Sequence, residues 1–295
     1  MNFFLYWFGR AVIGCVQSLP LKLVARVGRV GGTLAWFVDG KHRRVAVKNL
    51  MRVFQAKKPA AEIRASAKEC FRRIGENMAC AIKTAAMTDE ELKPHLTFDI
   101  AALPPNRGGR NLIFAIGHFG NFELYARITP VFPTGTRLAT TYRALKQPSL
   151  DRLMQEIRSR SGCQFFERRA EGTDLREAMS RSGLVLGLLG DQYARGMRTE
   201  FFGHICDTGL ACAVLALRYD CDLHTLFCYR TALAQWRVEL GDGIATHENG
   251  QARTAEDIMR DVNRSYEKAI RRDPANWFWV HDRWKVRRLR RLVPE

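Results

Sequence analysis

The residues with the clearest chemical potential stand in one short segment, Leu112-Ile-Phe-Ala-Ile-Gly-His118-Phe-Gly-Asn-Phe-Glu123. An apolar run typical of a buried strand ends at Gly117, and His118 follows in a short loop flanked by glycines. Active sites of open α/β sheets lie at the carboxyl ends of the strands, which is where this loop is expected. Because an imidazole can accept and return a proton near neutral pH, His118 is a candidate general base.

A carboxylate that could orient this imidazole follows in the same segment. On one continuous helix, His118 and Glu123 would point about 140° apart, since 3.6 residues make a turn. The two side chains can meet only if the chain bends between them, and Gly120 permits such a bend. With Asn121 as the predicted N-cap, Glu123 lies in the first helical turn, where the helix dipole favours an ionised carboxylate. The segment therefore predicts His118 as a base and Glu123 as its partner.

The proton for such a base is expected to come from the substrate. The nucleophile signature Gly-x-Ser-x-Gly is absent, and none of the eight cysteines has an evident catalytic partner. The direct interpretation is that His118 deprotonates a substrate hydroxyl, which then attacks an activated acyl group. The residues alone leave one alternative open, a structural histidine that caps a loop.

The elements that would position this segment alternate along the rest of the chain. Five runs have the composition of strands: Asn111–Ile116, Arg137–Tyr142, Leu184–Gly190, Leu223–Arg230 and Gln235–Leu240. Five further segments have helical spacing: Asn121–Ile128, Pro148–Arg160, Thr173–Ser182, Thr208–Tyr219 and Thr254–Arg272. This alternation predicts an α/β fold with a central, largely parallel or mixed sheet flanked by helices.

Residues 1–90 are predicted to be helical, and the first of them to contact a membrane. One broad helical face gathers apolar side chains, namely Phe4, Trp7, Phe8, Ala11, Val12 and Cys15. The chain is then rich in Lys and Arg from Lys22 to Arg52, and only Asp39 opposes them. Aromatic rings at the acyl boundary, with cations beside anionic headgroups, describe an interfacial anchor. The alternative is an ordinary helix packed on the domain.

The same N-terminal segment is a poor candidate for a transmembrane span. Arg10 interrupts the apolar run, and Gln17 and Pro20 follow, whereas a span needs about 18 or more uncharged apolar residues. We therefore expect two parts, a membrane-associating helical segment over residues 1–40 and an α/β catalytic domain over residues 41–295.

The charge of the chain predicts anionic partners. Its 47 Lys and Arg residues against 30 Asp and Glu residues give a net charge of +17, which suits nucleic acid, acidic lipid headgroups or an acidic protein. The sequence has no helix-turn-helix, zinc-finger or RNA-binding signature and no metal-like Cys/His spacing, so neither nucleic acid nor metal is expected. The cysteines are predicted to be reduced, as in a cytoplasm-facing protein, although those at 206, 212, 221 and 228 could pair in an oxidising compartment.

Five motifs along the chain carry a family resemblance. The run His118–Glu123 resembles the His-x-x-x-x-Asp/Glu signature of glycerolipid-type acyltransferases. Four further motifs follow in register, at Thr141–Leu153, Gly187–Gln192, Phe201–Gly209 and Pro274–Lys285. Together they resemble the bacterial lipid A late acyltransferase family over about residues 40 to 290. One such motif is weak evidence, whereas five in the right order are strong.

The resemblance implies an acyltransferase bound peripherally or monotopically at the cytoplasmic face of the cell inner membrane. It implies an acyl carrier protein thioester as donor and, as acceptor, a hydroxyl of a lipid A precursor, an anionic glycolipid in an anionic membrane. No dissociable cofactor is expected. His118 would be the base with Glu123 as its partner, and Arg143, Arg158 and Asp191 would bind substrate phosphate or organise the site.

Two features depart from the family pattern, and other functions stay open. Ala144 stands where the family often has Pro, and the N-terminus lacks the clean transmembrane helix of many members. A sister group of mannolipid acyltransferases shares the His/acid motif, so another glycolipid or a lysophospholipid is an alternative acceptor. The other class of function is a non-catalytic basic module for membrane or nucleic acid. The charge and the Trp277, Trp279 and Trp284 side chains favour it, and so does the basic C-terminal tail, which comprises Arg283, Lys285, Arg287, Arg288, Arg290 and Arg291.

Overall fold

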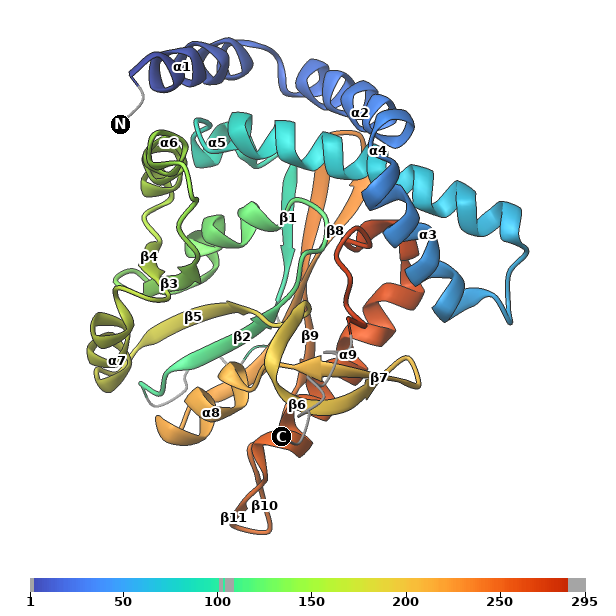
Figure 1. Cartoon of the computed structure of the whole chain (residues 1–295). Coiled ribbons are helices and arrows are strands. Elements are labelled where there is room, and N and C mark those ends of the chain that lie inside the picture. The colour runs from blue at the N-terminus through green and yellow to red at the C-terminus, as the bar shows by residue number, and fades with distance from the viewer. Residues whose placement is uncertain (1–2, 101–102, 104–108, 286–295) are drawn as a thin grey trace, which may run out of the picture.

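A seven-stranded sheet forms the centre of the computed structural model, which describes residues 3–100, 103 and 109–285 (Figure 1). The strand order is β1-β9-β8-β2-β5-β3-β4. Strands β8, β2, β5, β3 and β4 run parallel, β9 is antiparallel to β8, and β1 is parallel to β9. The strands are β1 (Leu96–Asp99), β2 (Leu112–Ile116), β3 (Arg137–Tyr142), β4 (Gln164–Glu167), β5 (Leu184–Leu189), β8 (Asp222–Ala232) and β9 (Gln235–Gly243). The predicted α/β fold with a largely parallel or mixed sheet is confirmed.

Strand β2 shows why its sequence is an unbroken apolar run. Phe114 and Ile116 belong to a core on one face of the sheet, and Ile113 and Ala115 belong to the core on the other face. All five residues of the strand are buried. A strand covered on both faces has no side for polar residues, which is typical of parallel sheets flanked by helices.

Nine α-helices lie within the described residues. They are α1 (Phe3–Ser18), α2 (Leu21–Val38), α3 (Gly40–Phe54), α4 (Ala60–Thr84), α5 (Asp89–Leu92), α6 (Pro148–Arg158), α7 (Gly172–Ser180), α8 (Ala211–Arg218) and α9 (Ala255–Arg272). In Figure 1, α1 and α2 follow one another along one side of the molecule, and α4 lies between α2 and the sheet. None of the described helices is both long enough and apolar enough to span a membrane.

The sequence missed the shortest elements and mistook one helix type. Strands β1 and β4 have four residues each, and the hairpin of β6 (Tyr193–Phe201) and β7 (His204–Thr208) is largely polar, so none of them carries a clear apolar period. A small hairpin, β10 (His247–Glu248) with β11 (Gln251–Ala252), was also not expected. The helix predicted over residues 121–128 is a short 3₁₀-helix, η1 (Phe122–Arg127).

Helix α2 is fixed to α4 by close backbone contact. A Cβ atom added to Gly32 would lie 2.2 Å from the carbonyl oxygen of Phe71, and one added to Gly75 would lie 2.2 Å from that of Gly28. No larger residue fits at this crossing, so the glycines allow the two helices to approach each other.

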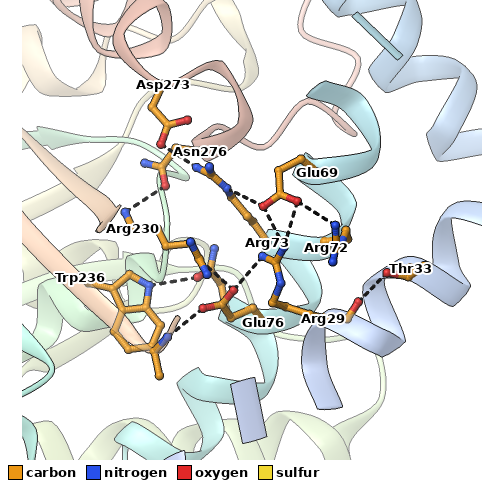
Figure 2. A network of polar contacts seen from close by, with 12 residues as sticks. Arg29, Thr33, Glu69, Arg72, Arg73, Glu76, Arg230, Trp236, Asp273 and Asn276 are labelled. Atoms are coloured by element: carbon orange, nitrogen blue, oxygen red, sulfur yellow. Dashed lines mark hydrogen bonds and ion pairs between the residues drawn. The ribbon is translucent and has the colours of Figure 1, made fainter. Parts of the chain in front are cut away.

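A network of ion pairs ties the same helices to the sheet (Figure 2). Glu76 on α4 is fully buried and pairs with Arg29 of α2 at 3.1 Å and with Arg230 of β8 at 2.8 Å. Arg73, also on α4, pairs with Asp273 after α9 at 2.6 Å. Because a buried charge is costly without partners, this network fixes the relative positions of α2, α4, β8 and the turn that follows α9.

Candidate active site

His118 lies in a sharp turn directly after β2. Gly120 has a φ of +51°, a left-handed conformation that favours glycine. This is the bend that the spacing of the segment required. The N–H of Phe119 donates to the carbonyl oxygen of Gly117, and that of Gly120 donates to the carbonyl oxygen of Asn276, so the turn is held on both sides.

Asp191 reaches His118 because their strands are neighbours. Strands β2 and β5 run parallel and pair Ile116 with Leu189. His118 lies two residues after the end of β2, and Asp191 lies two residues after the end of β5. Both residues are therefore at the carboxyl edge of the sheet. The Asp191 carboxylate, which is fully buried, lies 2.8 Å from Nδ1 of His118 through its Oδ1 atom. Its Oδ2 atom accepts the backbone N–H of His118 at 2.9 Å.

The electrostatics of the pair fix the position of the imidazole proton. Burial by itself raises the pKa of Asp191, but the facing His118 ring and three N–H donors lower it by more, so the pKa lies below its ordinary value. An ionised carboxylate only accepts hydrogen bonds, so Nδ1 of His118 carries a proton. In the neutral ring, Nε2 is then the acceptor, and no hydrogen bond engages it within the described part of the chain.

Glu123 faces a different partner from the one the sequence predicted. Its carboxylate accepts two hydrogen bonds from the Arg158 guanidinium of α6, at 2.6 Å and 3.1 Å. No hydrogen bond or ion pair joins Glu123 to His118 among the described residues. Asn121 stands at the predicted N-cap position, but its side chain makes no capping hydrogen bond. The chain continues as a 3₁₀-helix, and its course directs Glu123 toward α6 rather than back to the imidazole.

Arg143 stands apart from both pairs. It follows β3 directly, as the strand pattern suggested, and is exposed. The side chain has no ion pair with another described residue. Of the predicted basic tail, Arg283 is buried and donates to Thr208, whereas the cations of residues 287–291 lie outside the described residues. Within the described ranges, no three His, Cys, Asp or Glu side chains are placed to hold a metal ion.

A narrow groove and two apolar pockets adjoin the His118 loop. The groove, lined by His118 and by Phe122 and Phe278, whose rings both contact the imidazole, has a volume of about 10 Å³. The sheet pocket is a cavity of about 70 Å³ against β2, β3 and β5, and it also has Phe122 in its wall. The helix pocket is a cavity of about 210 Å³ between α4 and α6. Glu123 and Arg158 line both pockets, so their ion pair stands where the two meet.

None of the seven buried cysteines has the character of a nucleophile. All eight are free thiols, and every one except Cys15 is buried. Burial raises the pKa of Cys70, Cys80, Cys163 and Cys212 to about 12 in each case. A thiol with such a pKa is almost entirely protonated at neutral pH, so these buried cysteines are poor nucleophiles.

The sequence predicted no catalytic-site role for Trp277, which was considered only as part of a basic binding module. Its indole N–H donates to Oδ2 of Asp191 at 2.7 Å. The signal was present in the sequence, because Trp277 lies in the C-terminal motif Pro274–Lys285. The sequence did not show that Trp277 contacts Asp191, since nothing in it places the C-terminal motif against the end of β5.

The comparisons with known proteins identify a family. A family model described as bacterial lipid A biosynthesis acyltransferase matches residues 1–286. A comparison with curated proteins gave no match. The family match covers nearly the whole chain, including the His118 loop, the Asp191 strand and the C-terminal motif, and it agrees with the family that the five motifs indicated. The chain therefore belongs to the bacterial lipid A biosynthesis acyltransferase family.

Proposed function

We propose that this acyltransferase moves a fatty acyl chain from an acyl carrier protein thioester to a hydroxyl of a lipid A precursor. This is a secondary acylation in lipopolysaccharide biosynthesis. The observation that carries the proposal is the His118–Asp191 pair at the carboxyl edge of the sheet, with Nε2 left as an acceptor. The family supplies the substrate class, and the pair supplies a base for a hydroxyl group.

The proposed reaction needs no group beyond the two substrates. Nε2 of His118 takes the hydroxyl proton while the hydroxyl oxygen attacks the thioester carbonyl. The tetrahedral intermediate then expels the pantetheine thiolate, which takes the proton back from the imidazolium. Asp191 stabilises the transient imidazolium and keeps the ring in one tautomer. The donor thioester provides the activated acyl group, so no dissociable cofactor is part of the proposal.

We assign the other predicted site residues to substrate binding. The sheet and helix pockets have apolar linings suited to an acyl chain, and the Glu123–Arg158 pair stands where they meet. In this proposal Glu123 organises the acyl site through Arg158. Arg143 is an exposed cation at the carboxyl edge of the sheet and has no ion-pair partner in the part of the chain that the structure describes, so it suits a phosphate of the acceptor or the acidic donor protein.

The decisive experiment follows the thioester sulfur. We expect the purified chain to release free thiol from lauroyl- or myristoyl-acyl carrier protein only when a Kdo-bearing lipid A precursor is present, and mass spectrometry to show one added acyl chain. Thiol release with a lysophospholipid or another glycolipid, but not with the lipid A precursor, would identify a different acceptor. No release with any acceptor, together with steeply salt-dependent DNA binding, would favour the basic binding module instead.

The N-terminal helices support the proposed place at the cytoplasmic face of the inner membrane. Helices α1 and α2 lie along one side of the molecule (Figure 1) and leave many large apolar side chains exposed. These are Phe3, Phe4, Trp7, Phe8 and Val12 on α1, and Leu23, Val27, Val30, Leu34, Phe37 and Val38 on α2. Exposed cations such as Lys22 and Arg26 flank this face, and Asp39 is the only acidic residue before Glu62. A lipid surface with anionic headgroups fits both features.

Charged residues on the exposed face of α2 are expected to weaken membrane binding. Val30 and Leu34 are each 60% exposed, so aspartate at both positions disturbs little packing while removing apolar contact with lipid. We expect Val30→Asp with Leu34→Asp to lower the partition coefficient onto anionic phospholipid vesicles at least tenfold, as each lost side chain is worth about 1.5 kcal/mol or more.

Val214 provides the matched control, because it is an exposed apolar residue of α8, away from α1 and α2. Val214→Asp should bind vesicles like the natural chain in the same sedimentation assay. Equal binding by the α2 variant and the natural chain would remove α2 from the proposed membrane face.

A further inference from the structure

The C-terminal motif contains an indole aimed at the proposed catalytic pair. Trp277 is 1% exposed and follows the short 3₁₀-helix η4 (Pro274–Asn276). Its Nε1–H, the one hydrogen-bond donor of the ring, donates to Oδ2 of Asp191 at 2.7 Å. The other contacts of this carboxylate come from His118, through its backbone N–H and its ring. Trp277 is thus the only side chain besides His118 that hydrogen-bonds to Asp191 among the described residues.

The backbone that carries Trp277 is held from several sides. The carbonyl oxygen of Asn276 accepts the N–H of Gly120 at 3.0 Å, and the side-chain amide of Asn276 donates to the carbonyl oxygen of Cys228 at 2.9 Å. Asp273, three residues before Asn276, pairs with Arg73 of α4 in the network of Figure 2. The turn before Trp277 is therefore tied to the His118 loop, to β8 and to α4 at once.

The ring of Trp277 is also fixed in orientation. It packs edge-on against Trp279 with ring centroids 4.7 Å apart, and Phe201 lies 5.9 Å away. A buried indole in such a setting has no alternative position, so its N–H direction is determined by the fold.

We propose that Trp277 is a positioning residue for acyl transfer. Its indole N–H holds Oδ2 of Asp191, so that Oδ1 faces Nδ1 of His118 and Nε2 stays the acceptor for the substrate proton. The role of the pair in transfer rests on the proposed function, whereas the contact that Trp277 makes does not. The step that Trp277 affects is proton removal, so it should act on kcat rather than on substrate binding.

The other groups around Asp191 do not replace this donor. His281 accepts the N–H of Tyr193, and burial holds the pKa of His281 below its ordinary value. The buried Arg283 donates to Thr208 and to a backbone carbonyl. Tyr125 and Tyr266 donate to backbone carbonyl oxygens, and burial raises the pKa of both phenols, so they stay neutral.

The test removes the indole N–H and keeps the shape of the ring. Benzothienylalanine, in which sulfur replaces the N–H, is placed at position 277 alone by site-specific incorporation. A lost hydrogen bond to a charged group predicts a kcat about 10- to 100-fold lower, with KM for donor and acceptor within twofold. The acid limb of the kcat/KM profile should move to higher pH, because a carboxylate with one donor fewer holds the imidazolium proton more strongly. Trp277→Phe should likewise lower kcat and leave both KM values within twofold.

A second measurement is independent of turnover. The Nδ1 proton of His118 should give a downfield ¹H NMR signal in the natural chain, and this signal should shift or broaden in the position-277 variant. Trp236 offers the control, because it is equally buried and its Nε1 donates to Asn77 of α4 instead of to Asp191. The same analogue at position 236 should change neither kcat nor the signal.

The outcomes separate the two proposals. An unchanged kcat and signal at position 277, or a change in KM alone, would overturn the positioning role. A natural chain that shows the signal and its dependence on Trp277 but transfers no acyl group would refute the proposed function and leave the contact intact.

Discussion

Replacing His118 with alanine is expected to reduce kcat of acyl transfer by about 10²- to 10⁴-fold, the usual contribution of a general base. KM for the acyl donor and for the lipid acceptor should change little, because His118 lines the narrow groove and is not part of the walls of the two apolar pockets. The measurement is release of free thiol from acyl carrier protein thioester at saturating acceptor, with vesicle binding followed in parallel.

The alanine variant also removes one of the partners of a buried carboxylate, so its folding needs a control. His118→Asn keeps a donor close to the position of Nδ1, and the backbone N–H and Trp277 still hold Asp191. We expect it to unfold at nearly the natural Tm and to lose as much activity as the alanine variant. Substantial turnover by a folded His118→Asn protein would show that His118 is not the base.

The sequence located this histidine because its signals are local. The apolar run of β2, the flanking glycines and the position after a strand are all visible within residues 112–123. The same holds for the five longer strands of the sheet, whose apolar or alternating sequences differ from their surroundings. The fold class could be predicted from such local patterns, and it was confirmed.

The partner of His118 was harder to predict, because the pairing of His118 with Asp191 is a contact between distant segments of the chain. Asp191 was placed at the carboxyl edge of the sheet, but its facing residue follows from the parallel register of β2 and β5, which no spacing within one segment reveals. Glu123 was favoured because it lies near His118 in sequence. The 3₁₀ geometry of η1 and the length of the Arg158 side chain directed it elsewhere. The contact of Trp277 with Asp191 escaped prediction for the same reason as the pairing of Asp191 with His118.

Asp191→Asn is expected to cost kcat at least as much as the loss of the base, about 10³-fold or more. Two N–H groups point at the Oδ2 position, from the His118 backbone and from Trp277, so the asparagine oxygen should settle there. The amide NH₂ then faces Nδ1 of His118 and forces that nitrogen to become the acceptor. The imidazole proton moves to Nε2, and a neutral ring that donates at Nε2 cannot take a proton from the substrate hydroxyl.

Glu123→Gln tests whether Glu123 or Asp191 is the carboxylate that orients His118. It preserves size and an oxygen acceptor for Arg158 but removes the charge of the pair. Because Glu123 reaches Arg158 and not His118, we expect its effect to fall mainly on KM for the acyl donor, with kcat within about tenfold of the natural value. The same thiol-release assay on both variants compares them directly. If Glu123→Gln lost as much kcat as Asp191→Asn, Glu123 would have to contact the His118 imidazole during turnover. The η1 segment would then have to rearrange when substrate binds.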